Sequence, residues 1–246
     1  MNIEFENLKK KFAEIKNMNW VESVRKGSTG SGRTFEKLLG IEENNLEIPD
    51  YNGIEIKVKR SHSNSFTTLF NCTPEGPHYC EIERIKEKYG YPDKVLKEAK
   101  ILHNSVYCNQ KVKINDSYYF QLHVSEIEEK LYLKVIDRFG NVIEDTMYWT
   151  FDLLKEKLYR KLKNMAFVSA MRKIENGKEY FKYYKLEIYK LKSFDTFINL
   201  LKAGIIRVTF KIGVFRSGDK KGKIHDHGTG FDIEEKNLYK LYDQYL

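Results

Sequence analysis

The chain has 246 residues, of which 41% are hydrophobic, and its 43 lysines and arginines give it a formal net charge of +8. It has no apolar run near the roughly 20 residues that cross a bilayer. The first residues, "MNIEFENLKKKF", also lack the apolar centre of a signal peptide, so we expect a cytoplasmic protein that is not embedded in a membrane. The basic balance fits a polyanionic partner, although it only weakly separates nucleic acid from a membrane surface.

The three cysteines, Cys72, Cys80 and Cys108, are an odd number and do not indicate a disulfide framework. With His78 and His103 in the same part of the chain, a zinc site is conceivable. No CxxC pair is present, however, so the spacing does not favour zinc.

The first half of the chain mixes helical and strand patterns. Apolar residues at an approximately helical spacing predict a helix over residues 2–16. A glycine-rich turn at 27–32 leads to a second helix at about 33–44. A strand over 53–59 follows, and we expect "SFTTLF" to continue the same sheet. Residues 80–101 favour a charged helix that Pro92 interrupts.

The second half favours strands joined by hairpins. Its predicted elements, in chain order, are strands at 118–124, 131–137 and 142–145, a helix at 150–163, a hairpin at 165–190 that turns at "ENG", a helix at 193–203 and a strand at 205–215. A basic glycine-rich loop and a short terminal helix complete the chain. The order predicts a mixed α+β fold.

The stretch "PDYNGIEIKVK", residues 49–59, places two carboxylates and a lysine around one predicted strand. Glu55 and Lys57 share a face because residues two apart in a strand point the same way. Asp50 precedes the turn and can fold back beside Glu55. Two converging carboxylates bind a hard cation such as Mg²⁺, and a lysine beside them can orient water and stabilise negative charge. A solvated strand face with an ordinary Glu–Lys pair remains the alternative.

This stretch resembles the PD-(D/E)xK nuclease motif, and its surroundings resemble the MvaI/BcnI restriction endonucleases and their mismatch-repair relative MutH. Four further segments resemble that family in the same order: "RKGSTGSGRTFEKLL", "TLFNCTPEGP", "YWTFDLLKEKLYRKLK" and "SGDKKGKIHDHGTGF". The resemblance implies that Asp50 and Glu55 are metal ligands together with the backbone of Ile56. It also implies that Lys57 is the catalytic lysine and that Glu36 supports the site.

The resemblance also implies an organisation and a reaction. We expect one nuclease domain over 1–246 with the mixed β-sheet core of the PD-(D/E)xK fold and two lobes around a DNA cleft. The catalytic lobe would come mainly from the N-terminal half, and the recognition lobe would include about 193–246. The expected activity is that of a Mg²⁺-dependent type II restriction enzyme that acts on double-stranded DNA as a monomer, with a cognate DNA methyltransferase as its functional partner. A MutH-like nicking enzyme and a DNA-binding protein without catalysis remain alternatives.

The glycine-rich stretch "GSTGSGRT", residues 27–34, also approaches a P-loop, with Arg33 where the lysine belongs. A P-loop needs a buried strand before it, and "NMNWVESVRK" is a poor one. Amides at a helix start, flanked by Arg25, Lys26 and Arg33, suit a DNA backbone phosphate instead. A simple helix-entry turn is the alternative.

The loop "GDKKGKIHDHGTGF" carries two histidines two residues apart, behind a run of lysines. His225 and His227 could ligate a transition metal, but no third ligand is evident. In the family that the chain resembles, this segment enters the DNA groove and its histidines contact base edges. We therefore expect His225 and His227 to read bases, with Lys220 and Lys221 on the DNA as well. A solvated basic loop is the plain alternative.

The chain departs from the family pattern around this loop. The pattern implies an Asp and an Arg two apart in the preceding strand and an Arg after "GTxF", whereas this chain has Thr209, Lys211 and Asp232 there. Lys211 can still donate to guanine, but Asp232 cannot donate as an arginine does. His78, in "EGPHY", is either a further base contact or an ordinary loop residue.

Overall fold

The computed structural model describes residues 3–42, 48–60 and 66–245. The chain divides into two compact units, and neither is continuous in sequence. Unit 1 comprises residues 1–65, 158–192 and 239–246, whereas unit 2 comprises residues 66–157 and 193–238. Among the described residues, no helix is long and apolar enough to cross a membrane. The cytoplasmic location stays a prediction.

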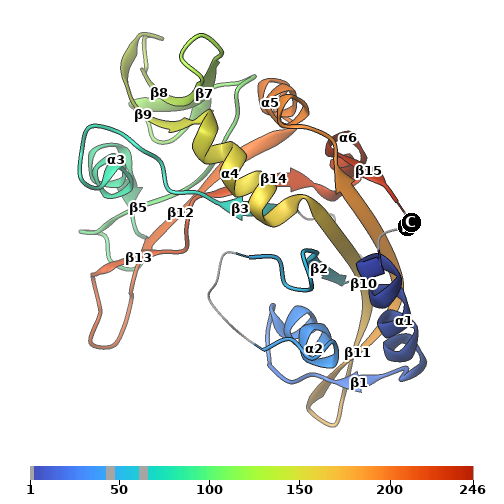
Figure 1. The fold of residues 1–246 in the computed structure, drawn as a ribbon. Coiled ribbons are helices and arrows are strands. Elements are labelled where there is room, and N and C mark those ends of the chain that lie inside the picture. Colours follow the sequence, from blue (N-terminus) through green and yellow to red (C-terminus); the bar gives the residue numbers. More distant parts are fainter. Residues whose placement is uncertain (1–2, 43–47, 61–65, 246) are drawn as a thin grey trace. The chain divides into compact units, whose positions relative to one another are not determined.

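Unit 1 is built on one mixed sheet in the order β1-β11-β10-β2, with β15 pairing β11 on a separate branch. Its strands are β1 (Val21–Glu22), β2 (Glu55–Arg60), β10 (Asn164–Glu175), β11 (Lys178–Leu191) and β15 (Tyr242–Gln244). The long hairpin of β10 and β11, drawn in yellow and orange in Figure 1, confirms the hairpin predicted at 165–190. Strand β2 joins this hairpin parallel to β10, which places Glu55 opposite Met165.

The helices α1 (Ile3–Asn17) and α2 (Gly30–Leu38) pack on this sheet, α1 against β11 and α2 against β2. The predicted apolar stripe of α1 is correct from Phe5 onward, since Phe5, Leu8, Phe12 and Ile15 are all buried, whereas Ile3 is exposed. Helix α2 begins at Gly30, three residues earlier than predicted. The buried Ile54 and Ile56 join the same core, so one side of β2 is anchored by apolar packing.

Helix α4 (Phe151–Leu162) confirms the helix predicted at 150–163, and it leads directly into β10. Leu154, Leu158 and Leu162 recur every four residues and are fully buried. This spacing keeps one face of the helix on the core, so the polar side chains of its last turn are held in fixed directions. Lys161 is one of them.

Unit 2 contains two sheets. The first has the order β3-β14-β12-β5-β4, with β13 pairing β12, and the second has the order β6-β7-β8-β9. The strands of the first sheet are β3 (Phe66–Asn71), β4 (Tyr91–Pro92), β5 (Lys100–Val106), β12 (Ile206–Val214), β13 (Ile224–Asp226) and β14 (Gly230–Glu234). Those of the second are β6 (Val112–Lys113), β7 (Tyr118–Ser125), β8 (Lys130–Asp137) and β9 (Val142–Thr150).

Two helices of unit 2 follow from clear local signals. Helix α5 (Phe194–Lys202) begins after Ser193, whose hydroxyl accepts a hydrogen bond from the Thr196 N–H at 3.1 Å, and Gly204 follows with a φ of +68°. Helix α3 (Glu81–Tyr89) carries a buried apolar side at Ile82 and Ile85. A 3-10 turn (Glu235–Asn237) and the short α6 (Leu238–Leu241) lie near the C-terminus.

Two predictions about elements were wrong. Residues 66–71 form β3 in a sheet of unit 2, paired with β14, so they do not continue the sheet of β2. The expected helix at 80–101 ends at Tyr89: Pro92 lies in β4, residues 94–99 form bends and turns, and β5 begins at Lys100. The pairing of β5 with β12 outweighs the helical propensity of the charged residues before it. The mixed α+β class is confirmed.

Candidate active site

A tight turn before β2 positions Asp50. Asn52 and Gly53 adopt left-handed conformations, with φ of +43° and +81°, and backbone hydrogen bonds join Tyr51 and Ile54 across the turn. The Asp50 carboxylate then accepts a hydrogen bond from the Ile56 N–H at 2.9 Å. The sequence predicted that Asp50 folds back toward the strand, and the structure places it there.

Glu55 and Lys57 lie on the same side of β2, as a period of two requires. The Lys57 ammonium donates to Glu55 Oε1 at 2.8 Å, and the Glu55 side chain is only 2% exposed. A solvated strand face is therefore wrong. Burial raises the pKa of Glu55, and the nearby Asp50 charge adds to this, whereas Lys57 and Lys161 act in the opposite direction.

Two buried oxygens in unit 1 have no hydrogen-bond partner among the described residues. They are Glu55 Oε2 and the hydroxyl oxygen of Tyr242, a residue that is 1% exposed on β15. Burial, and then the charge of Glu55, raise the pKa of Tyr242. An unpartnered carboxylate oxygen in a buried position is costly, and a cation would satisfy it.

The residues present fit a hard divalent cation. Asp50 and Glu55 would offer carboxylate oxygens to such an ion and Ile56 would offer its backbone carbonyl, and Mg²⁺ commonly keeps several waters besides one or two carboxylates. Among the described parts of the chain, no group of three or more His, Cys, Asp or Glu side chains is arranged to hold a metal ion.

Lys161 was not singled out by the sequence. Its ammonium lies 3.4 Å from Glu55 Oε1, the same oxygen that Lys57 contacts. In the sequence it stands in the run "YRKLK", where nothing distinguishes it from its basic neighbours. Only the junction of α4 with β10, and the pairing of β10 with β2, bring it to Glu55.

Glu36 lies on α2 in the same unit, and its carboxylate is 3.3 Å from the Arg33 guanidinium. Arg33 also donates to the Ile41 carbonyl at 3.2 Å. These contacts tie down the C-terminal end of α2. The structure therefore gives Glu36 a partner on its own helix, and its support of the metal site stays a prediction.

The glycine-rich turn before α2 has no buried strand in front of it, because β1 covers only Val21–Glu22 and is not buried. The P-loop interpretation is therefore not favoured. Arg25 and Lys26 are exposed there, and Gly30 packs so closely on the Arg25 carbonyl that a Cβ would lie 2.5 Å from it. The turn thus holds the backbone of Arg25 against the first residue of α2.

The histidine loop forms a short hairpin in unit 2. His225 lies on β13 opposite Gly213 of β12, and its ring stacks on Phe215 with the centroids 4.1 Å apart. The His227 ring lies 3.9 Å from the His225 ring. Lys220 and Lys221 are exposed in the loop that precedes β13. The stacking gives both imidazoles defined positions beside an exposed basic loop.

A third histidine, which the sequence analysis did not connect with these two, lies nearby. His103 is on β5, and its Nε2 would be 3.2 Å from a Cβ at Gly213. Burial and then the charge of His227 lower the pKa of His103. The register of β5 against β12 causes this approach, and no local spacing in the sequence indicates it.

The three positions that depart from the family pattern are gathered by β12 and β14. The Asp232 carboxylate accepts hydrogen bonds from the hydroxyls of Thr209 and Thr68, both at 2.7 Å. The Lys211 ammonium lies 4.0 Å from the same carboxylate. Asp232 is 5% exposed at its side chain, so it is a held, buried anion and not an outward-reaching donor.

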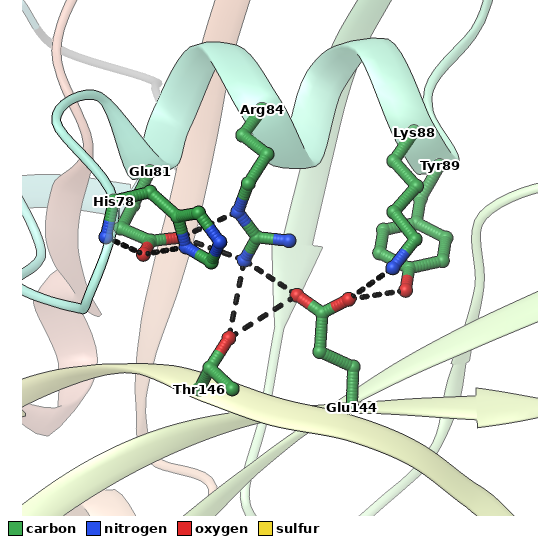
Figure 2. Close-up of polar contacts among 7 residues, drawn as sticks. All are labelled: His78, Glu81, Arg84, Lys88, Tyr89, Glu144 and Thr146. Atoms are coloured by element: carbon green, nitrogen blue, oxygen red, sulfur yellow. Dashed lines mark hydrogen bonds and ion pairs between the residues drawn. The ribbon is translucent and has the colours of Figure 1, made fainter.

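His78 belongs to a polar network between α3 and β9, which Figure 2 shows with all seven of its side chains. Its Nδ1 lies 2.7 Å from Glu81 Oε1, and Arg84 contacts the other Glu81 oxygen at 2.6 Å. Although burial opposes the ionisation of Glu81, the hydrogen bonds from His78 and Arg84 outweigh it and lower its pKa. The His78 side chain is 50% exposed, so its ring is fixed from one side and open on the other.

The same network continues from Arg84 to Glu144 of β9. Glu144 contacts Arg84 at 2.5 Å, the Lys88 ammonium at 2.6 Å and the Tyr89 hydroxyl at 2.5 Å. Three donors from α3 thus meet one carboxylate of the sheet. The network fixes α3, and with it the loop that carries His78.

Comparison with known proteins gives a matching family and similar structures, which cover nearly the whole chain. The model of the family described as "MvaI/BcnI restriction endonuclease family" matches residues 9–242. The chain is similar to the structure of restriction endonuclease MvaI in complex with its cognate DNA substrate, with 36% identity and a TM-score of 0.89 over 99% of this chain and 98% of that one. Against MvaI in the absence of DNA, the identity is 35% and the TM-score 0.64, over 99% and 97% of the two chains. Comparison with curated proteins gives no match.

Proposed function

Because the chain belongs to the MvaI/BcnI restriction endonuclease family and is a site-specific deoxyribonuclease, we propose that it cuts double-stranded DNA by a Mg²⁺-dependent hydrolysis at Asp50, Glu55 and Lys57. The observation that carries this proposal is the buried Glu55 carboxylate, which has Lys57 and Lys161 on one oxygen and, among the described residues, no hydrogen-bond partner on the other. A buried anion of this kind is costly in a structural role and useful in a metal site.

In this proposal Asp50 and Glu55 hold the cation, with the backbone carbonyl of Ile56 as a third oxygen. When bound, Mg²⁺ polarises a phosphate oxygen and lowers the pKa of a water. Asp50 is held by the Ile56 N–H, so its carboxylate orientation is fixed before any ligand arrives. Lys57 opposes the effect of burial on the pKa of Glu55 and offers an ammonium to the negative charge that develops at phosphorus.

Unit 1 supplies the catalytic residues, and unit 2 supplies the candidate base-reading residues. We propose that His225 and His227 contact base edges, that Lys220 and Lys221 lie on the DNA as well, and that Lys211 and His78 take part in recognition. Asp232 contributes by holding Lys211. Arg25, Lys26 and Arg33 meet backbone phosphates, and Glu36, which pairs with Arg33, supports the metal site.

The chain then works as a monomer, with a cognate DNA methyltransferase protecting the host's own sites. The two similar structures are of MvaI with its cognate DNA substrate and in the absence of DNA, and by similarity this chain binds DNA as well. A MutH-like nicking enzyme would use the same chemistry with other partners.

Incubation of the purified protein with plasmid and Mg²⁺ tests these alternatives. Discrete linear fragments are expected for a restriction enzyme. Open circles as the final product would favour the nicking enzyme, and a mobility shift without cleavage would contradict the enzymatic proposal. Sequencing the ends of the fragments would then identify the site and the cut position.

A further inference from the structure

Three hydroxyl side chains and one carboxylate form a continuous row across the first sheet of unit 2. The row runs from Ser105 on β5 to Thr209 on β12, and then to Asp232 on β14 and Thr68 on β3, which are consecutive strands of the sheet. The hydroxyl oxygens of Ser105 and Thr209 are 3.1 Å apart, and each threonine donates to one Asp232 oxygen at 2.7 Å. Because hydrogen bonds join them from strand to strand, the four side chains lie on one face of the sheet.

The row is accessible, and a lysine stands at its β3 end. The residues that carry the three hydroxyl groups are half-buried, whereas the Asp232 side chain is only 5% exposed. The Lys211 ammonium donates to the Thr68 hydroxyl at 3.3 Å, and its side chain is 35% exposed. Gly230 leaves room for this arrangement, because a Cβ there would lie 3.0 Å from both the Lys211 ammonium and Asp232 Oδ1.

The carboxylate fixes the direction of the hydrogen bonds in the row. Asp232 faces two cations, Lys211 at 4.0 Å and Arg207 at 3.8 Å, which match an ionised carboxylate. An ionised carboxylate only accepts hydrogen bonds, and a hydroxyl group has one proton and two lone pairs. Thr209 gives its proton to Asp232, so it can only accept from Ser105. Ser105 is therefore the donor in that contact, and its oxygen can only accept from any further group.

The other end of the row has the opposite polarity. Thr68 also gives its proton to Asp232, so it accepts from the Lys211 ammonium. An ammonium has three protons and no lone pair, so Lys211 keeps donors for a further group. The face thus presents an acceptor at Ser105 and a donor at Lys211. Base edges in the major groove are distinguished by such a pattern of donors and acceptors.

We propose that Ser105 is a specificity-determining residue, whose hydroxyl oxygen accepts a hydrogen bond from the exocyclic amino group of a cytosine or an adenine. The inference rests on the proposed function, because that function brings base edges to Lys211 on the same face. Cytosine N4 and adenine N6 are the amino groups that the major groove displays, whereas thymine O4 and guanine O6 need a donor. Asp232 acts through Thr209 as a positioning residue, since it decides where the Ser105 proton points.

The test measures binding in EDTA to a duplex that the wild-type protein selects from a randomised pool. In one set of duplexes each cytosine in turn is replaced by 2-pyrimidinone and each adenine by purine, analogues that lack the amino group. In a second set the same places carry thymine or guanine, which display a keto oxygen instead. Comparison between proteins on the same duplex cancels the effect of the analogue on the duplex itself.

The variants are Ser105→Ala, Thr209→Val and Thr209→Ser. Ser117→Ala is the control for loss of a serine hydroxyl, since Ser117 is an exposed serine of the same unit. Circular dichroism and thermal unfolding first establish that each variant is folded.

At one position, removal of the amino group should weaken binding of the wild-type protein and of Ser117→Ala by roughly 10- to 100-fold, the scale of one good base contact. Ser105→Ala should bind the unmodified duplex more weakly by a similar factor and lose nothing further on the analogue. In Thr209→Val the Ser105 proton is free to turn outward, so the preference for an amino group over a keto oxygen at that position should fall. Thr209→Ser should restore this preference, because its hydroxyl can again link Ser105 to Asp232.

An equal loss on the analogues for Ser105→Ala and wild type at every position would overturn the inference, because Ser105 would then contact no amino group. An unchanged preference for the amino group in Thr209→Val would also contradict it, and so would a wild-type protein that selects no sequence from the pool. Failure of the proposed function is a separate result: the wild-type protein would not cut DNA with Mg²⁺, whereas binding in EDTA involves no cleavage and would still report the base contact.

Discussion

The carboxylate of Asp232 accepts a hydrogen bond from the Thr209 hydroxyl at 2.7 Å, between the neighbouring strands β14 and β12. Lys211, two residues beyond Thr209, brings its ammonium to 4.0 Å from the same carboxylate. The three residues that distinguish this chain from the family pattern are thus one connected group. A carboxylate accepts hydrogen bonds and donates none, so we expect a target that differs from the one an arginine at this position would read.

Asp232→Asn should therefore change which sequences are preferred. The amide keeps the size of the side chain but removes the negative charge that faces Lys211 at 4.0 Å and Arg207 at 3.8 Å, so both cations would lose an attractive partner. Selection of bound duplexes from a randomised pool, in EDTA, measures the preference of both proteins. Asp219→Asn, in the exposed basic loop, is the control. Identical selected sequences for Asp232→Asn and wild type would show that this group has no part in recognition.

Glu55→Ala should abolish cleavage and leave DNA binding intact or stronger, because a negative charge near phosphate is removed. Lys57→Ala should also be inactive. Plasmid cleavage and gel-shift binding measure the two properties on the same preparations. Glu14→Ala, an exposed glutamate on α1, should behave as wild type. Cleavage by Glu55→Ala at near the wild-type rate would mean that the active site lies elsewhere.

His225→Ala and His227→Ala should each lose roughly 1–3 kcal/mol of binding to the specific site, and little on random duplex. Lys220→Ala and Lys221→Ala should weaken binding to both duplexes alike and reduce its salt dependence. The loss of affinity for the specific duplex, compared with the loss for a random duplex, distinguishes base-reading residues from residues that contact phosphates. Equal losses on both for the histidine variants would reduce His225 and His227 to backbone contacts or structural residues.

The network at Glu144 predicts a pH dependence of stability. Burial alone would raise the pKa of Glu144, but hydrogen bonds from Arg84, Lys88 and Tyr89 lower it to about 2, from an ordinary value of 4.5. Because the folded-state pKa is the lower one, this stabilisation is complete above pH 4.5 and is lost as the pH falls toward 2. Its size is on the order of 3 kcal/mol.

Glu144→Gln should therefore be less stable than wild type at pH 7, and the difference should shrink between pH 4.5 and pH 3. Urea unfolding at these three pH values measures the free energy of unfolding of both proteins. Asp145→Asn changes the exposed neighbouring carboxylate and should show a much smaller difference. A difference between Glu144→Gln and wild type that does not depend on pH would contradict the assignment of the low pKa to Glu144.

The sequence predicted the elements whose signals are local. The spacing of the leucines indicates α4, and the turn between β10 and β11 indicates their hairpin. Helix α5 is delimited by its cap Ser193 and by Gly204. The position of Asp50 against β2 was also predictable, because a turn of "YNG" and a strand with a period of two leave it little choice. These features depend on neighbours within a few residues.

What the sequence did not indicate depends on pairing between distant strands. Lys161 reaches Glu55 because β10 pairs with β2, and His103 reaches the histidine loop because β5 pairs with β12. Pairing between distant strands also explains why β3 does not continue the sheet of β2. The partner of β3 is β14, which lies more than 150 residues later in the chain. Non-local pairing leaves no periodicity in a single sequence, so the complete surroundings of Glu55 required the structure.

The last prediction concerns stoichiometry. Asp50, Glu55 and Lys57 are the single set of residues in this chain that matches the catalytic motif, and one active centre cuts one strand at a time. An obligate dimer would place two such centres across its two-fold axis and cut both strands together. The sequence contains no heptad pattern that would favour a helical dimer. We therefore expect a monomer that nicks one strand and then turns to the other.

A plasmid time course at limiting enzyme should show nicked circles before linear product. Light scattering of the protein–DNA complex should give the mass of one chain on one site. A catalytically inactive Glu55→Ala protein serves for the mass measurement, because the DNA stays intact during it. Linear product without a nicked intermediate, together with two chains on one site, would rule out the monomer, because two centres would then be acting on the same duplex at once.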